Sequence, residues 1–366
     1  MSIYELEMKQ LLVILCAVLG TALSAGLQCK DEEGNNVDWY VVYKIPEGYS
    51  SQSGITSGKE YMFITSNTVE KRWTFSKKTM AENTNIISRT IENMYQKSDK
   101  ELWLVYNDQG PARTRSKTIN AIREIIDLLW NKHGHTKGVV GANSEGGFWL
   151  VHSIPRFPTL DSYNYPHNAL RNGQSALCIS LSAEELDKIG NAFKYNFPDF
   201  VRSQYSDELG AKFPTLKEAA EGGKTSNAPW NNSFAITSKG GVQFETFAKG
   251  KSFGKDLYEW LASALSTDLY AETWQNELHP LSASCSISKK VMNVHKISYK
   301  PANLYFKSRK DHSKWAISAS HEKPYVCIGD INRALPQEKR GGGTVCIRNE
   351  GLWKAYNDII DEKDSC

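Results

Sequence analysis

The sequence has 366 residues, of which 40% are hydrophobic and 23% are charged, and this globular composition excludes disordered and fibrous architectures. The 44 basic and 41 acidic side chains give a formal net charge of only +3, so the overall charge does not indicate a polyanionic partner. Any site for a polyanion therefore has to gather its basic groups locally. The length is sufficient for two domain-sized cores.

Residues 1–26 are typical of a secretory signal peptide. An apolar run of 12 residues, from Leu11 to Ala22, follows Lys9 and leads into small residues. Cleavage after Ser24 and cleavage after Gly26 both fit this pattern. The run is shorter than the roughly 20 residues that span a bilayer, and no later run approaches that length, so we expect no membrane span.

Six cysteines follow the signal peptide: Cys29, Cys178, Cys285, Cys327, Cys346 and Cys366. An even number of cysteines in an exported chain predicts disulfides, here three of them. Zinc sites need ligands at short spacing, and the closest pair, Cys327 and Cys346, is 19 residues apart, so we predict no metal. Asn231 begins an Asn-x-Ser sequon and is a candidate for glycosylation.

Short elements of both kinds are predicted along the chain, which gives a mixed α/β fold class. Aromatic and β-branched residues predict strands at Val37–Ile45, Leu102–Tyr106, 138–143, 148–153, Asn303–Lys307, Trp315–Ser318 and Tyr325–Ile328. Apolar spacing of three and four residues predicts helices at Lys117–Lys132, Ser182–Phe193, Lys255–Trp274 and Trp353–Ile360. The region from Asn164 to Gly240 is rich in Gly, Asn, Pro and Ser. We place the boundary between the two halves, residues 27–200 and 201–366, within this region.

An internal repeat is centred on a basic triplet. His135-Thr136-Lys137 recurs 177 residues later as His312-Ser313-Lys314. The same displacement aligns Val140 with Ile317, Val151 with Ile328 and Arg156 with Arg333. Each triplet leads into a predicted strand, turn and strand, so the two copies indicate a shared functional origin, whereas one H-x-K triplet alone is expected by chance.

The duplicated triplet suits the hydrolysis of a phosphodiester. Residues i and i+2 of an extended segment project from one face, so each histidine can share a site with its lysine. Two ammonium groups would stabilise charge on the nonbridging oxygens, one neutral imidazole would attack phosphorus, and the other, protonated, would donate to the leaving oxygen. No step of this scheme requires a metal or another cofactor. Imidazoles beside lysines depress each other's protonation, which is compatible with an acid pH optimum.

The duplicated H-x-K motif resembles the phospholipase D superfamily, and the surrounding sequence resembles deoxyribonuclease II. The blocks that carry this resemblance extend over essentially the whole mature chain. They are Cys29–Pro46 (CKDEEGNNVDWYVVYKIP), Gly134–Val139 (GHTKGV), Gly146–Pro158 (GGFWLVHSIPRFP), Asn172–Leu181 (NGQSALCISL), Asp311–Ser318 (DHSKWAIS) and Cys327–Cys346.

The resemblance implies a pseudo-dimer of two phospholipase D-like α/β halves with the active site at their interface. It further implies a lysosomal or secreted acid endonuclease that cuts double-stranded DNA without metal, through a phosphohistidine, and leaves 3′-phosphate and 5′-hydroxyl ends. By the family pattern, the catalytic group is His135, Lys137, His312 and Lys314. The triplets alone leave open which histidine attacks, and the resemblance slightly favours His135. The implied disulfides are Cys29–Cys178, Cys285–Cys366 and Cys327–Cys346.

The sequence also departs from the wider superfamily. The superfamily pattern continues as H-x-K-x4-D, but Ala142 and Ala319 stand at these positions, which argues against a phospholipase. Further candidates for DNA contact are His152, Asn332, Arg156, Arg333 and Arg340. A secreted relative that binds nucleic acid or host components without turnover is the alternative, and a phosphodiesterase for RNA or phospholipid is a third possibility. The oligomeric state is left open.

Overall fold

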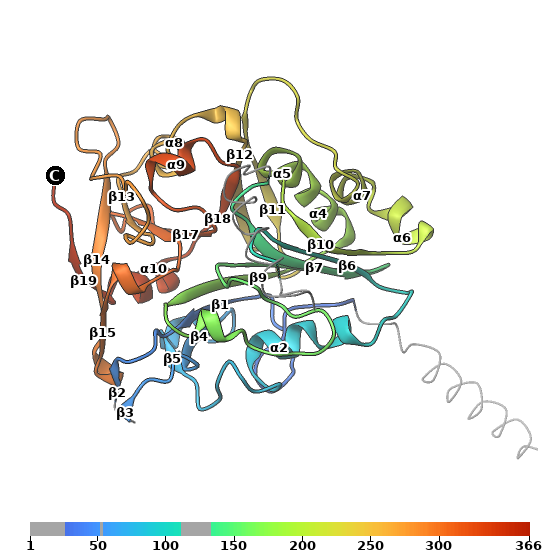
Figure 1. The fold of residues 1–366 in the computed structure, drawn as a ribbon, viewed down its shortest axis with the longest axis horizontal. Coiled ribbons are helices and arrows are strands. Elements are labelled where there is room, and N and C mark those ends of the chain that lie inside the picture. The colour runs from blue at the N-terminus through green and yellow to red at the C-terminus, as the bar shows by residue number, and fades with distance from the viewer. Residues whose placement is uncertain (1–25, 52–53, 111–132) are drawn as a thin grey trace, which may run out of the picture.

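The structure is a computed structural model that describes residues 26–51, 54–110 and 133–366 (Figure 1). Residues 1–25 of the predicted signal peptide and the predicted helix Lys117–Lys132 lie outside the described residues. Among the residues described, no helix is long and apolar enough to cross a membrane.

Two large sheets form the frame of the molecule, and a small hairpin of β2 (Ser50–Ser51) and β3 (Gly54–Ile55) lies apart from them. The first sheet has the strand order β10 (Phe200–Gln204), β6 (Leu102–Asn107), β7 (Lys137–Asn143), β8 (Gly146–His152), β9 (Gln174–Leu181), β1 (Trp39–Lys44), β4 (Tyr61–Thr65), β5 (Thr74–Phe75). The second has the order β11 (Asn231–Thr237), β12 (Gln243–Lys249), β18 (Gly342–Arg348), β17 (Tyr325–Gly329), β16 (Trp315–Ser318), β13 (Leu269–Glu272), β14 (Val291–Tyr299), β15 (Leu304–Lys307), with β19 (Ile360–Lys363) paired to β14. The predicted mixed α/β class is confirmed.

The α-helices of the described residues are short. They are α2 (Ile86–Ile91), α4 (Ala183–Asp187), α5 (Ile189–Asn196), α6 (Asp207–Lys212), α7 (Pro214–Ala220), α8 (Leu257–Ala264), α9 (Leu335–Glu338) and α10 (Glu350–Asn357). The prediction of one helix over Lys255–Trp274 is wrong beyond Ala264. There the chain turns through Ser266, which has a φ of 51°, and continues as β13. The apolar residues of this strand match helical spacing by coincidence, and pairing with β14 and β16 decides the outcome.

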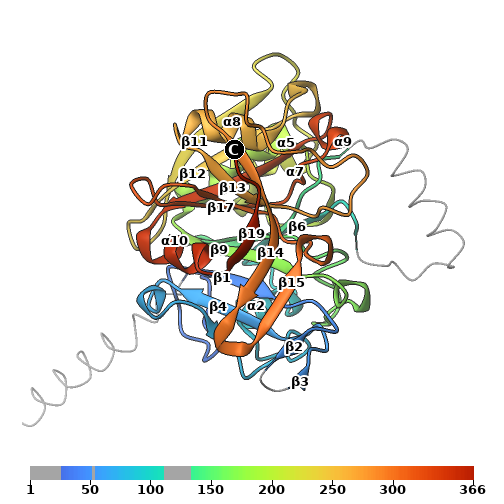
Figure 2. The same cartoon turned by 90° about the vertical axis from the view of Figure 1, so that its left-hand side faces the viewer.

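The layers follow from the period-two alternation of buried strands. Trp39, Val41 and Tyr43 of β1 face the second sheet, in a core that includes α5 and α10, while Tyr40 and Val42 face α2. On the far side of the second sheet a third cluster packs under α8. Figure 2 shows this succession from α8 through the two sheets to α2.

The predicted repeat is a structural repeat. Gly138 pairs with Val151 across β7 and β8, and their partners in the second copy, Trp315 and Ile328, pair across β16 and β17. Both hairpins thus have the same register. β7 and β16 are both interior strands of their sheets. The two triplets, which lead into these strands, therefore occupy corresponding positions in the two halves of the α/β fold that the resemblance implied.

Three disulfides stabilise the halves. They join Cys29 to Cys178, Cys285 to Cys366 and Cys327 to Cys346, as the resemblance implied. The first spans 149 residues, worth on the order of 4 to 5 kcal/mol in the chain-entropy account. Such bonds are typical of chains that fold in an oxidising compartment, in agreement with the secretory pathway.

The pairing of β10 favours a later division of the chain than the sequence suggested. The predicted boundary between residues 200 and 201 falls within β10, which pairs with β6 of the first sheet. Next, α6 and α7 follow, and α7 packs against α5 of the first half. We propose that the two halves divide in the segment 221–230, between α7 and β11.

Candidate active site

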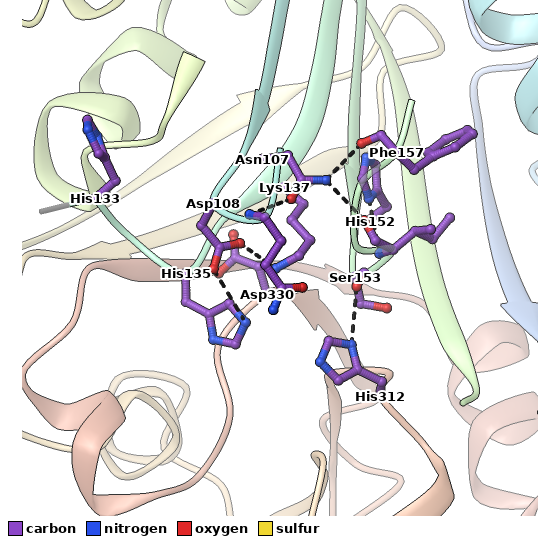
Figure 3. Close-up of polar contacts among 12 residues, drawn as sticks. Asn107, Asp108, His133, His135, Lys137, His152, Ser153, Phe157, His312 and Asp330 are labelled. Carbon is purple, nitrogen blue, oxygen red and sulfur yellow. Dashed lines mark hydrogen bonds and ion pairs between the residues drawn. The ribbon is translucent and has the colours of Figure 1, made fainter. Parts of the chain in front are cut away.

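Both H-x-K triplets lie immediately before an inner strand of their sheet. Lys137 is the first residue of β7, and Lys314 directly precedes β16. The imidazole rings of His135 and His312 face one another with their centroids 6.4 Å apart, as Figure 3 shows. The two lysines are also close enough to interact, because the charge of Lys137 is second only to burial among the causes that lower the pKa of Lys314. The structure therefore brings together four predicted residues from both halves.

Each triplet is held by the backbone of the opposite half. The amide N–H of His135 donates to the carbonyl oxygen of Gly341 at 2.8 Å, and that of His312 donates to the carbonyl oxygen of Gly173 at 2.9 Å. These crossed hydrogen bonds fix both histidines at the interface. A change in how the halves pack would therefore displace both imidazoles.

A glutamine from the opposite half orients each imidazole. The Oε1 of Gln337 lies 3.0 Å from Nδ1 of His135, and the Oε1 of Gln174 lies 3.3 Å from Nδ1 of His312. The carbonyl oxygen of Ser153 is a further partner of His312, at 3.2 Å. Because these oxygens only accept hydrogen bonds, both Nδ1 atoms carry hydrogen. The neutral imidazoles then keep their lone pairs on Nε2, which is the nitrogen available for reaction.

Two further buried lysines hold the segments that carry these partners. Lys44, the last residue of β1, donates to the carbonyl oxygens of Ala169 and Leu170 at 2.7 and 2.9 Å. Lys249, the last residue of β12, donates to three carbonyl oxygens of residues 337–340. The two lysines occupy corresponding positions, since Lys44 pairs with Gln174 and Lys249 pairs with Gly342. The supports of the site are thus duplicated along with the triplets.

Asp108 is the acidic centre of the site. Its carboxylate accepts hydrogen bonds from Lys137 and, at 2.7 Å, from Arg340, and it lies 4.0 Å from Nε2 of His135. Burial favours the neutral acid, but the charges of Lys137, His135 and Arg340 outweigh it and hold the pKa of Asp108 far below its usual range. Asp108 therefore stays ionised in acid and anchors one of the two lysines.

Both imidazoles are disfavoured as cations in the free protein. His135 and His312 are 5% and 8% exposed, and burial is the largest cause that lowers the pKa of each well below its ordinary value. The next cause is the neighbouring ammonium, Lys137 for His135 and Lys314 for His312. The predicted mutual depression of the basic groups is confirmed in direction.

Known proteins are similar to this chain over nearly its whole length. The sequence pattern described as deoxyribonuclease II matches residues 28–366. The chain belongs to the deoxyribonuclease II family. It is 36% identical to plancitoxin-1 of Acanthaster planci, over 100% of this chain and 99% of that protein. It is 35% identical to deoxyribonuclease-2-alpha of Rattus norvegicus, over 97% and 98%, and 34% identical to deoxyribonuclease-2 of Caenorhabditis elegans, also over 97% and 98%. The predicted family and enzyme class are confirmed.

Behind the imidazole of His135, Gln337 and Glu277 form a chain of polar groups that the sequence did not suggest. The carboxylate of Glu277 accepts hydrogen bonds from the side-chain amides of Gln337 and Asn332. The contact fixes the amide of Gln337 with its oxygen toward His135. The Oδ1 of Asn332 has no hydrogen-bond partner within the described residues. Asn332 therefore remains a candidate for contact with substrate.

The other predicted DNA contacts have different positions. Arg333 is buried, and its guanidinium donates to Asp256 at 2.9 Å and to Asn293 at 2.6 Å, so we propose a structural role for it in place of the expected DNA contact. His152 is fully buried, accepts a hydrogen bond from the N–H of Ile154 at 3.1 Å, and has a pKa lowered to about 3 by burial and by Lys137. We interpret it as a structural residue. Arg156 is half-buried and remains a proposed contact.

The glycines beside the first triplet allow close packing rather than flexibility. A Cβ atom on Gly134 or Gly341 would lie 2.0 or 2.3 Å from the carbonyl oxygen of Asn196, which no side chain permits. Gly342 and Gly343 belong to β18, and the N–H of Gly343 donates to Asp330 at 2.9 Å. The segment Gly341–Gly343 is therefore a packed entry to β18.

Replacing Gln337 with glutamate tests how the site sets its pH dependence. A carboxylate 3.0 Å from Nδ1 of His135 would favour the imidazolium and raise the pKa of His135. We expect Gln337→Glu to move the pH optimum of cleavage upward by roughly one unit. The limb of the pH–rate profile that moves identifies the role: the high-pH limb for a general acid, the low-pH limb for a nucleophile. Gln243→Glu, on an exposed residue, is the control, and an unmoved optimum would contradict the assignment.

Asp330 predicts a second pH effect, on stability. Burial raises the pKa of Asp330 to about 7, against partial compensation by the N–H of Gly343 and by Lys137. The folded protein therefore holds a proton there that the unfolded chain loses near pH 4, and stability falls as pH rises from about 4 toward 7. Asp330→Asn keeps an acceptor for Gly343 and carries no charge. We expect its melting temperature to exceed that of the wild type by several degrees at pH 8 and to match it at pH 4, by calorimetry.

Proposed function

We propose that this protein is an acid endonuclease that hydrolyses double-stranded DNA with little sequence preference and without a metal ion or other cofactor. The observation that carries the proposal is the pair of imidazoles, 6.4 Å apart and each backed by a lysine. A phosphodiester bound between the rings would place phosphorus about 3–3.5 Å from the attacking nitrogen and its leaving oxygen within hydrogen-bond reach of the other imidazole. An intact site also argues against a relative that binds without turnover.

The proposed reaction has two steps. In the first, Nε2 of one neutral imidazole attacks phosphorus, an N–P bond forms and the P–O5′ bond breaks. The leaving oxygen takes its proton from the other imidazolium, which gives a 5′-hydroxyl end. In the second, that imidazole, now neutral, takes a proton from water, whose oxygen attacks phosphorus as the N–P bond breaks. The product is a 3′-phosphate end, and the ammonium groups of Lys137 and Lys314 stabilise the nonbridging oxygens throughout.

The lowered pKa values of both histidines support activity in acid. One imidazole has to be protonated for the first step, and burial opposes this in the free protein. A bound phosphodiester adds a negative charge that favours one imidazolium, but the required proton is still easier to obtain as the pH falls. An acid optimum suits the lysosome, and the same protein could also act outside the cell after secretion.

The proposed DNA contacts go to the backbone. Lys137, Lys314, Arg340 and Arg156 are suited to phosphate oxygens, and such contacts carry no base information, so we expect nearly nonspecific cutting. Binding by cationic groups releases counterions from the DNA, and this release becomes less favourable as the salt concentration rises, so binding weakens. The logarithm of the affinity, measured by filter binding, should therefore fall linearly with the logarithm of the salt concentration.

The test is a plasmid-nicking assay at pH 5 in EDTA with the full-length protein. We expect nicked and linear products whose 3′ ends become polymerase substrates only after phosphatase treatment. Mass spectrometry of the quenched reaction should find phosphate on His135 or His312. Offering RNA and phospholipid vesicles to the same preparation separates the third possibility, and the absence of any DNA cleavage between pH 4 and 7 would overturn the proposal.

A further inference from the structure

A cavity lies beside the active site. It has a volume of about 240 Å³, and Gly134 and Gly341 line it. Gly134 directly precedes His135, and the carbonyl oxygen of Gly341 accepts the hydrogen bond from the N–H of His135. His133 points away from the two catalytic imidazoles, as Figure 3 shows, and it lines this cavity instead. The cavity therefore adjoins the backbone that positions His135.

The cavity has an aromatic platform. The rings of His133 and Phe197 stack nearly parallel, with centroids 4.8 Å apart and an angle of 6° between the planes. Phe197 adopts a left-handed backbone conformation (φ 49°) at the C-terminal end of α5. This conformation fixes the position of its ring relative to the helix. Trp230 is a further aromatic residue of the lining. Flat aromatic faces of this kind bind planar rings by stacking.

The charged side chains of the lining are all basic. They are Lys194, Lys224 and Lys251, from three separate segments. Lys194 is paired with Glu218 at 3.0 Å, and Lys224 lies 5.4 Å from the centre of the Phe197 ring. Lys251 is exposed. The chain as a whole is nearly neutral, so these three lysines form a local concentration of positive charge beside an aromatic surface. Such a surface favours a ligand that has a planar ring joined to an anionic group.

Two buried polar atoms of the cavity lining also indicate the kind of ligand. Nδ1 of His133 and Oδ1 of Asn196 have no hydrogen-bond partner among residues 26–51, 54–110 and 133–366. Asn196 is 4% exposed. The edge of a nucleobase carries both donors and acceptors, and so offers the partners that the protein lacks here.

We propose that this cavity binds one unpaired nucleobase of the DNA strand next to the scissile phosphate. The base stacks on the platform of His133, Phe197 and Trp230, and Lys224 and Lys251 contact the flanking phosphates. The inference rests on the proposed nuclease function. It adds that the substrate strand is held by a nucleotide taken out of the base stack, so single-stranded or mismatched DNA binds more tightly than a perfect duplex.

The experiment uses the full-length His312→Asn protein, so that DNA is bound and not cut. Single-stranded oligonucleotides with one 2-aminopurine are titrated at pH 5 in EDTA. We expect the fluorescence of 2-aminopurine to fall on binding, because stacking on aromatic rings quenches it. Trp230→Leu keeps an apolar side chain without the large ring, and it should weaken binding about fivefold or more. Lys224→Ala with Lys251→Ala should lower the slope of log affinity against log salt by about 1.4.

The control is Lys212→Ala, which removes an exposed lysine of α6 outside the cavity and should leave affinity and salt slope as they are. The proposal is overturned if binding leaves 2-aminopurine fluorescence unchanged, or if neither Trp230→Leu nor the lysine pair weakens binding. A failure of the proposed function is seen separately, since it appears as absence of cleavage by the protein with both histidines intact. Binding to the cavity is measured without cleavage.

Discussion

His135→Ala and His312→Ala are each expected to lower DNA cleavage at pH 5 by at least about 1,000-fold. Each removes an imidazole that has no substitute: the rings face each other across the site, and no other histidine of the described residues stacks or bonds with them. Since attack and proton delivery belong to one reaction, the double variant should be little worse than either single one. Plasmid nicking in EDTA measures the loss.

The matched control is His321→Ala, on an exposed residue of the loop between β16 and β17. It should cleave DNA like the wild type. Circular dichroism and melting curves should show that the two site variants fold, because the main supports of the triplets, the backbone bonds to Gly341 and Gly173, do not depend on the imidazoles. If either site variant keeps near-wild-type activity, the paired-imidazole assignment is wrong.

The catalytic pair could be predicted from sequence because its signal is local. Each histidine is followed two residues later by lysine and then by a strand, and the pattern occurs twice. The two hairpins have the same register. For this reason the displacement of 177 residues between the copies is the same at the triplets and at Val151 and Ile328. Strands with aromatic and β-branched residues, such as β1 and β16, were predicted for the same reason.

The supports of the pair could not be predicted, because they come from segments distant in sequence. Gln337 and Gln174 reach their histidines from 202 and 138 residues away. Asp108 directly follows a short buried strand, and nothing in its neighbourhood marks it as the partner of Lys137. β9 and β18 were not predicted either, since strands that are buried on both faces and contain Ser, Thr and Gly show little alternation.

The repeat also hides a difference between the two halves. Asp108 follows β6 at the position where Trp274 follows β13, because Tyr106 pairs with Gly138 as Glu272 pairs with Trp315. One histidine therefore has a carboxylate near its reactive nitrogen, and the other has an indole packed edge-on at 5.2 Å. The site is symmetric in its reacting groups and asymmetric in its electrostatics, which suits two imidazoles that have to act in different protonation states.

Asp108→Asn tests this asymmetry and should have the largest effect on stability. The substitution keeps the shape of the side chain but leaves Lys137 and Arg340 without their shared anion in a buried site. Breaking a buried ion pair from one side costs about 3–5 kcal/mol of unfolding free energy. Because the pKa of Asp108 is held far below the unfolded value, the cost should be the same at pH 5 and pH 7 and should decline only below about pH 4.

The measurement is urea unfolding at pH 3, 5 and 7, with Glu350→Gln as the control. Glu350 pairs with Lys354 on the surface of α10, and its loss should change stability little. Asp108→Asn should also shift the pH optimum of cleavage downward, since the imidazolium of His135 loses its nearest carboxylate. If the variant is as stable as the wild type at pH 5, Asp108 is not the anchor of Lys137. If it is less stable but keeps its pH optimum, Asp108 holds the lysine without setting the protonation of His135.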